Sequence, residues 1–412
     1  MAAASKYDLY SSEFRKHSHE VFAQMRADAP LIKQIGLDGE TAIWFVTRYA
    51  EAQQVLSDDQ HFVRDIRLAF EPAVLAHMLG DQDAQIDRML NNNMLEREGE
   101  DHRRLRSIVS KAFTPKVIQS MRPRVEQIAN DLLDRVIEKG QMELVADYAF
   151  PLPITVIAEL LGVPLDNQDQ FRVWSNAFVR PTLTPEEGME ALRMLQAFVG
   201  YMQQLVAERR LQPGTDLLSG LIHAEENGDR LNESELFSML SLLIVAGHET
   251  TVSLIGNSVL ALLRDPERLR ELQNHPDLLP TALEEFLRYD SPVERALARF
   301  VAHDVELAGQ QLKRGELIIV LLSSANRDEV QFSDPAQLDV QRQQNRHIAF
   351  GCGVHYCLGA PLARLEGEIA LRTLLQRLPD LTLDIPQESL EWRDVPLFHS
   401  LMRLPVTWKT SS

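Results

Sequence analysis

The stretch from Phe350 to Gly359 carries the clearest potential for chemistry in this sequence. It reads Phe-Gly-Cys-Gly-Val-His-Tyr-Cys-Leu-Gly, and its three glycines leave the backbone bare enough for a large flat ligand to approach. Cys357 stands just before an Ala-rich, apolar run at 360–375 that predicts a helix. A thiolate there would face unpaired N–H groups and the positive end of the helix dipole. An ionised sulfur on such a loop is a good axial ligand for haem iron.

A different interpretation treats the cysteines as a pair. Cys352 and Cys357 are the chain's two cysteines, so they could form a disulfide or supply half of a metal site. A tetrahedral zinc site would need two further ligands from elsewhere, and the spacing matches no zinc or redox motif. The haem interpretation is therefore favoured, and the cysteine pair stays open as an alternative.

The same loop also carries a family resemblance. It resembles the haem-binding loop of the cytochrome P450 family position by position, and the run at 360–366 extends the likeness. The resemblance covers the chain from about Phe14 to its end. It implies that Cys357 ligates the iron of haem b. It also implies cofactor contacts from Phe350, Gly351, Gly353, His355, Gly359 and Ala363.

Residues 232–264 predict one long helix. Asn232 and Glu235 form a capping-box pattern, no proline follows until Pro266, and the flanks are apolar. The middle reads Ala246-Gly247-His248-Glu249-Thr250-Thr251, and polar groups inside an apolar helix are costly unless they have partners or a use. Small Ala246 and Gly247 would let a flat ring lie close.

Two interpretations of this polar segment remain open. Thr250 could bond back to a carbonyl and open the helix locally, or the segment could be a kinked core helix with Glu249 in a salt bridge. The resemblance favours the first, because Ala246, Gly247, Glu249 and Thr250 match the family's oxygen-activating groove. It implies that Glu249 and Thr250 are the acid–alcohol pair that delivers protons.

Other positions are candidates for holding the haem propionates. His102 and Arg106 are four apart on a predicted helix and share a face, where they could bind carboxylates or form an ordinary solvated basic face. The resemblance favours the first role, and it adds Arg299, His347 and His355. It also implies a buried structural triad, which serves folding and not chemistry, of Glu285, Arg288 and Arg342.

The composition excludes some classes of protein. The chain has 412 residues, 45% of them hydrophobic, which is ample for a large core, and its net charge of −18 argues against nucleic-acid binding. The start lacks a signal-peptide pattern, and the apolar run at 236–247 is too short to cross a bilayer. We expect a cytoplasmic protein that does not enter a membrane.

We expect one domain over residues 1–412, a monomer, and a mainly α fold with small β-sheets (α+β). The implied fold is that of cytochrome P450, with the haem between the long central helix and the cysteine-loop helix. A hairpin is predicted around Asp38-Gly39, and strands at 297–307 and 317–322. Residues 62–97 look irregular, and they could form a substrate-facing lid or pack as an ordinary loop.

The resemblance implies a haem-thiolate monooxygenase that uses dioxygen. Such an enzyme would hydroxylate or epoxidise a mid-sized hydrophobic substrate, and the likeness is greatest to the group that oxidises polyketides and macrolides. Charge from Glu294 and Arg295 is expected near the pocket rim. The expected pocket walls are Met89, Met94, Phe178, Leu183, Leu243, Ala246, Val293, Leu297 and Phe398.

The source of electrons follows from what the sequence lacks. No Gly-rich nucleotide fingerprint follows a strand, so NAD(P)H would act only indirectly, through a separate ferredoxin and ferredoxin reductase. A basic cluster could dock such a partner, or it could be a solvated face. It consists of Arg103, Arg104, Lys111, Lys116, Arg122 and Arg124.

Three other functions stay in view. The chain could be a steroid or fatty-acid hydroxylase of the same family, or a peroxide-driven or isomerising haem-thiolate enzyme. It could also be a non-catalytic helical binding protein with an unrelated cysteine pair.

Overall fold

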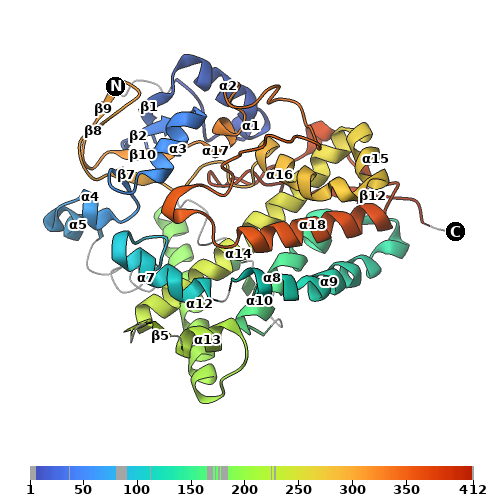
Figure 1. The fold of residues 1–412 in the computed structure, drawn as a ribbon, viewed down its shortest axis with the longest axis horizontal. Helices are drawn as coiled ribbons and strands as arrows, with labels where there is room; N and C mark the ends of the chain where they lie inside the picture. Colours follow the sequence, from blue (N-terminus) through green and yellow to red (C-terminus); the bar gives the residue numbers. More distant parts are fainter. Residues whose placement is uncertain are drawn as a thin grey trace.

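The computed structural model describes residues 6–36, 38–79, 91–111, 113–164, 170–171, 173–174, 177, 184–223, 225–226 and 229–410. Helices dominate it, and the labelled strands of the largest sheet lie on the side where the N-terminus is marked (Figure 1). The described helices are α1 Ser12–Lys16, α2 Ser18–Asp28, α3 Tyr49–Ser57, α4 Ile66–Ala69, α5 Pro72–Leu79, α7 Gly99–Ser110, α8 Pro115–Ser120, α9 Arg122–Asp134, α10 Pro151–Leu161, α12 Pro185–Leu211, α13 Leu217–His223, α14 Glu233–Arg264, α15 Pro266–Asn274, α16 Leu279–Tyr289, α17 Leu322–Ala325 and α18 Ala360–Arg377.

The largest described sheet has five strands in the order β1-β2-β10-β7-β3. The predicted hairpin is confirmed as its first pair, with Leu31 opposite Val46, and β10 runs parallel to β2. The strands are β1 Leu31–Ile35, β2 Ala42–Val46, β3 Phe62–Val63, β7 Arg299–Val301 and β10 Leu317–Val320.

The remaining described strands form three smaller sheets. They are β4 Gln141–Glu143 with β11 Thr382–Leu383 and β12 Pro405–Thr407, β5 Glu225–Glu226 with β6 Asp229–Arg230, and β8 Val305–Leu307 with β9 Gln310–Leu312. The region predicted as irregular, 62–97, contains β3, α4 and α5 in its described part, so that prediction was wrong there. The predicted strand at 297–307 is divided into β7 and β8.

Helix α14 forms the centre of the molecule. The Asn232 side chain accepts from the Glu235 N–H, and the Glu235 carboxylate accepts from the Asn232 N–H, so the predicted capping box is confirmed. The helix packs against α10, α16 and α18, and most of its residues are buried. Of the described helices, α14 alone is long and apolar enough to cross a membrane, and 72% of its apolar window is buried inside the protein.

The crossing of α14 and α18 depends on small residues. A Cβ atom at Gly367 of α18 would lie 2.9 Å from Leu283 of α16 and 3.1 Å from Leu254 of α14. A larger residue would therefore push three helices apart. Thr251 of α14 and Glu366 of α18 meet near the same crossing, and Cys357 lies three residues before α18 begins.

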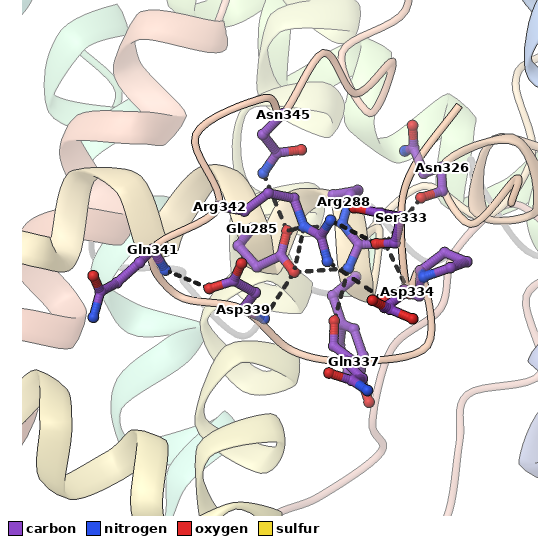
Figure 2. Close-up of polar contacts among 12 residues, drawn as sticks. Glu285, Arg288, Asn326, Ser333, Asp334, Gln337, Asp339, Gln341, Arg342 and Asn345 are labelled. Carbon is purple, nitrogen blue, oxygen red and sulfur yellow. Dashed lines mark hydrogen bonds and ion pairs between the residues drawn. The ribbon is translucent and has the colours of Figure 1, made fainter. Parts of the chain in front are cut away.

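A buried charge cluster connects α16 to the long loop before Cys357. Figure 2 shows Glu285 between two guanidinium groups, both of which face its carboxylate. Arg288 donates to both carboxylate oxygens at 2.7 Å, and the Arg342 Nε approaches them at 3.2 and 3.1 Å. The backbone carbonyls of Ser333, Pro335 and Gln337 accept further bonds. The three residues of the predicted triad therefore meet.

Candidate haem-thiolate site

The loop before Cys357 turns tightly at two glycines. Gly351 and Gly353 adopt φ values of +69° and +73°, which residues with a side chain rarely adopt. A Cβ atom at Gly353 would also lie 2.6 Å from the Leu56 carbonyl at the end of α3. The Cys357 N–H donates to the Phe350 carbonyl at 3.0 Å and closes the loop.

The two cysteines have separate surroundings. Both are free thiols. The Cys352 sulfur lies 3.4 Å from the Ser57 hydroxyl and 3.8 Å from the Gln53 carbonyl, so it faces α3. The structure therefore gives no support to a disulfide between Cys352 and Cys357.

Cys357 is half-buried just before the N-terminal end of α18. Burial raises the pKa of the Cys357 thiol, and the N–H groups of Gly359 and Ala360, with nearby Arg106 and Arg364, oppose that rise only in part. The Gly359 and Ala360 N–H groups therefore favour the charged sulfur, as predicted, but burial outweighs them. A coordinated metal cation would supply the missing stabilisation, because metal-bound thiols lose their proton.

Three residues predicted to hold propionates lie around Glu98. The His102 and His355 rings are 4.4 Å apart, and the His355 Nε2 lies 2.9 Å from the Glu98 carboxylate. Arg299 is buried, donates to the Phe62 carbonyl at 2.8 Å, and is close enough to Glu98 to interact with its charge. The His355 Nδ1 is buried and has no partner among the described residues. Such a donor fits a carboxylate of a bound cofactor.

The other two propionate candidates make different contacts. Arg106 is half-buried and donates to the Tyr356 carbonyl at 2.7 Å. Both ring nitrogens of His347 already have partners, since Nδ1 accepts from the Ala349 N–H at 3.2 Å and Nε2 faces Glu284 at 3.1 Å. These contacts support a structural role for His347, and its cofactor role stays a prediction.

The polar segment of α14 presents two faces. Ala246 is exposed and Thr250 half-buried, in contrast to the buried His248 and Glu249 between them, so this face could lie against a flat ring. The Thr250 hydroxyl donates to the Ala246 carbonyl at 3.1 Å, which confirms the predicted back-bond, yet the α-helix continues unbroken. A Cβ atom at Gly247 would lie 2.8 Å from Ile157 of α10, so this glycine's open side faces another helix.

Glu249 lies on the buried face with two basic partners. Arg393 donates to its Oε2, and the His248 Nε2 lies 3.4 Å from its Oε1. Burial alone would raise the pKa of Glu249, but His248 and Arg393 outweigh it and lower the pKa to about 2. A cavity of about 170 Å³ adjoins Glu249 and Arg393, and it is large enough to hold water. Water there could exchange protons with Glu249.

Sequence reasoning missed Arg393, because its partner lies 144 residues away. It also gave no role to Glu366, which is fully buried in α18. Burial raises the pKa of Glu366 well above its ordinary value. The nearby Thr251 side chain lowers it, but burial is the larger effect, and neither carboxyl oxygen has a well-aligned hydrogen-bond partner among the described residues. The sequence did contain a signal for Glu366, because this acidic residue interrupts an apolar face of the predicted helix.

Only some of the predicted pocket walls come together in the described structure. Val293 and Phe398 pair in an isolated β-bridge, and Leu243 and Ala246 lie one turn apart on α14. Met94 is buried in the main core, and Leu297 is exposed. Met89, Phe178 and Leu183 lie outside the described residues.

The prediction that Glu294 and Arg295 place charge at the pocket rim was wrong. Both side chains are buried and 3.2 Å apart, and Arg295 donates to the Leu9 carbonyl near the N-terminus. Arg15 of α1 also approaches Glu294, at 3.6 Å. A buried carboxylate needs such partners, and the N-terminal segment supplies them.

Replacing Arg393 by glutamine tests the charge state of Glu249. A lowered pKa stabilises the fold above the unfolded value of about 4.5, and that stability is lost as the pH falls toward 2. The loss of stability in Arg393→Gln should therefore be larger at pH 7 than at pH 3, measured as guanidinium midpoints. The exposed Arg403, 3.9 Å from Glu391, gives the control Arg403→Gln, which should show little change at either pH. Equal losses in Arg393→Gln at both pH values would contradict the pairing.

Comparisons with known proteins agree with this arrangement. The family model "Cytochrome P450" matches residues 12–391. The chain is 40% identical over 400 residues to the cytochrome P450 monooxygenase PikC of Streptomyces venezuelae, covering 96% of this chain and 92% of that protein. It is 39% identical over 404 residues to the polyketide biosynthesis cytochrome P450 PksS of Bacillus subtilis, covering 97% of each.

A solved structure is similar along almost its whole length. The myxobacterial cytochrome P450 CYP267B1, in complex with myristic acid, superposes with a TM-score of 0.92 at 39% identity, over 98% of this chain and 99% of that one. The expected mainly α fold with small sheets is confirmed. The chain therefore belongs to the cytochrome P450 family and is a cytochrome P450 monooxygenase.

Proposed function

We propose that this protein hydroxylates or epoxidises a mid-sized hydrophobic molecule of the polyketide or macrolide kind, using dioxygen and haem b. The observation that carries the proposal is the half-buried free thiol of Cys357, which the loop 350–359 holds at the start of α18. Similarity to PikC, PksS and a mycinamicin IV hydroxylase/epoxidase supports the substrate class.

Different residues of the chain would bind the haem, transfer protons and position the substrate. Cys357 would ligate the iron, and His102, Arg299 and His355 would bind the propionates, with the unpartnered His355 Nδ1 as one donor. Haem, when bound, supplies the activation of dioxygen and the oxidation of a substrate C–H bond. Glu249 would exchange protons with the adjoining cavity, and Thr250 would hold the last proton at its hydroxyl oxygen. Val293, Phe398 and Leu243 would exclude water and orient the substrate.

We further propose that the chain is one domain over residues 1–412 and works as a monomer in the cytoplasm. A separate ferredoxin and its reductase would supply electrons from NAD(P)H. The basic cluster is a weak candidate for docking them, because four of its six members are paired with carboxylates: Arg103 with Glu100, Arg104 with Glu235, Arg122 with Glu368, and Arg124 with Glu159. Docking should therefore depend on other charges as well.

A steroid or fatty acid is the second candidate substrate. Two similar proteins favour it: a vitamin D(3) 25-hydroxylase that is 38% identical over 404 residues, and the solved structure with myristic acid. The two candidates are separated by measuring the low-to-high spin shift of the purified holoprotein with macrolide, steroid and fatty-acid libraries. Tight binding of a steroid or fatty acid, with no response to any macrolide, would overturn the first proposal.

Thr250→Ala tests the assigned chemistry with the substrate found by that screen. Without the hydroxyl, product formed per NADH consumed should fall by on the order of 100-fold while peroxide accumulates, because the final proton is no longer placed. Ser258→Ala is the matched control, since Ser258 makes the same kind of bond to the Leu254 carbonyl in a buried part of α14. Unchanged coupling in Thr250→Ala would favour a peroxide-driven or isomerising enzyme instead.

A further inference from the structure

Three distant segments meet in a cluster of imidazole and carboxylate groups that the proposed reaction does not use. His19 comes from α2, Asp290 follows α16 directly, and His399 lies in the C-terminal segment. The Nε2 atoms of both histidines lie 3.2 Å from the Asp290 Oδ1. The three potential ligand atoms are all within 4.8 Å of one another.

The two 3.2 Å distances to the Asp290 Oδ1 suit a four-coordinate zinc ion. Zinc binds imidazole nitrogen and carboxylate oxygen at about 2.0–2.2 Å, which places tetrahedral ligands roughly 3.4 Å apart. Three protein ligands would leave the fourth position to water. The His19 side chain is 26% exposed, whereas Asp290 and His399 are buried, so an ion could enter from the His19 side.

The surroundings of His399 resemble the outer shell of a zinc site. Its Nδ1 lies 3.8 Å from the Glu294 Oε2, and both atoms are buried without a hydrogen-bond partner among the described residues. Metal-bound histidines usually direct this second nitrogen at a carboxylate. Trp392 stacks on the His399 ring at 3.9 Å, and the Asn257 side chain donates to the His399 carbonyl at 2.8 Å. The ring is therefore held before any ion arrives.

The neighbouring cations make their closest contacts with other groups, although Arg327 also lies near enough to interact with the charge of Asp290. Arg15 and Arg295 approach the other oxygen of Glu294, at 3.6 and 3.2 Å. Arg327 lies over the Tyr289 ring and donates to the Tyr289 carbonyl at 2.8 Å.

We propose that His19, Asp290 and His399 form a structural zinc site. The ion would join α2, the end of α16 and the C-terminal segment, which also carries Arg393 and Phe398. It would therefore stabilise the N-terminal helix and the segment that pairs with Glu249. This inference does not depend on the proposed substrate.

The test uses the untagged, full-length holoprotein, first treated with a chelator and then titrated with zinc chloride. Calorimetry should show one zinc ion per chain, and His19→Ala and Asp290→Asn should bind at least tenfold more weakly. At zinc 100-fold above the Kd, Tm should rise by about 3 °C in the wild type and not in His19→Ala. His17→Ala is the control, because His17 is two residues away and exposed, and it should behave as the wild type.

Two results would overturn the proposal: no zinc-dependent change in the wild type, or equal binding by His19→Ala and the wild type. If Asp290→Asn fails to fold, zinc binding by His19→Ala still tests the proposal, because His19 is partly exposed and its replacement should disturb the fold less. The carbon-monoxide spectrum, recorded before and after zinc, reports the haem site separately. A failure of the proposed function would therefore leave the zinc result standing.

Discussion

Replacing Cys357 by serine is expected to abolish the strongly red-shifted Soret band of the reduced, carbon-monoxide-bound protein. That band requires thiolate ligation, and a serine hydroxyl cannot replace the sulfur as an electron donor to iron. Product formation should disappear with it. The measurement is a difference spectrum of the purified protein, with circular dichroism to show that the helical fold is retained.

The matched control is Cys352→Ser, five residues away in the same loop. Cys352 faces the Ser57 hydroxyl and the Gln53 carbonyl of α3, and a serine could keep both contacts. The band should therefore remain at full height. A band that survives in Cys357→Ser, or that is lost in Cys352→Ser, would rule out the proposed ligand.

Replacing Glu285 by glutamine is expected to prevent accumulation of folded protein. Arg288 is fully buried and Arg342 is 9% exposed, so the substitution leaves two guanidinium groups without their counter-charge. Breaking a buried pair costs about 3–5 kcal/mol, a large part of the roughly 5–15 kcal/mol that stabilises a typical protein. The free energy of unfolding in guanidinium and the yield of soluble holoprotein both report this loss.

Glu190→Gln is the control for that substitution. Glu190 and Arg193 have the same spacing as Glu285 and Arg288, but they lie on an exposed part of α12, 3.2 Å apart. Exposed pairs of this kind contribute about 0–0.5 kcal/mol. If Glu285→Gln cost no more than Glu190→Gln, the cluster in Figure 2 would not be essential for folding.

Local features of the fold were predictable because the residues that form them are neighbours in the chain. The capping box of α14 involves Asn232 and Glu235, and the Thr250 back-bond reaches one turn to Ala246. The turns of the cysteine loop need positive φ at Gly351 and Gly353, which the residue type itself indicates. The family resemblance rests on these same short motifs.

The errors came from charges whose partners lie far away along the chain. Glu294 and Arg295 look like pocket residues in sequence, but Arg15 and the Leu9 carbonyl hold them at the N-terminal segment. The partner of His347, Glu284, lies 63 residues earlier and was likewise not foreseen, while the cofactor role of His347 stays a prediction. Nothing near these residues in the sequence indicates such partners.

By itself, the amino-acid sequence determined the family, the position of the candidate iron ligand and the central helix, since each depends on local backbone geometry and short spacing. Only the tertiary structure decided the charge state of Glu249, the contacts of Cys352 and the meeting of His19 with Asp290 and His399. Burial and long-range ion pairing set these properties, and both arise only when distant segments pack together.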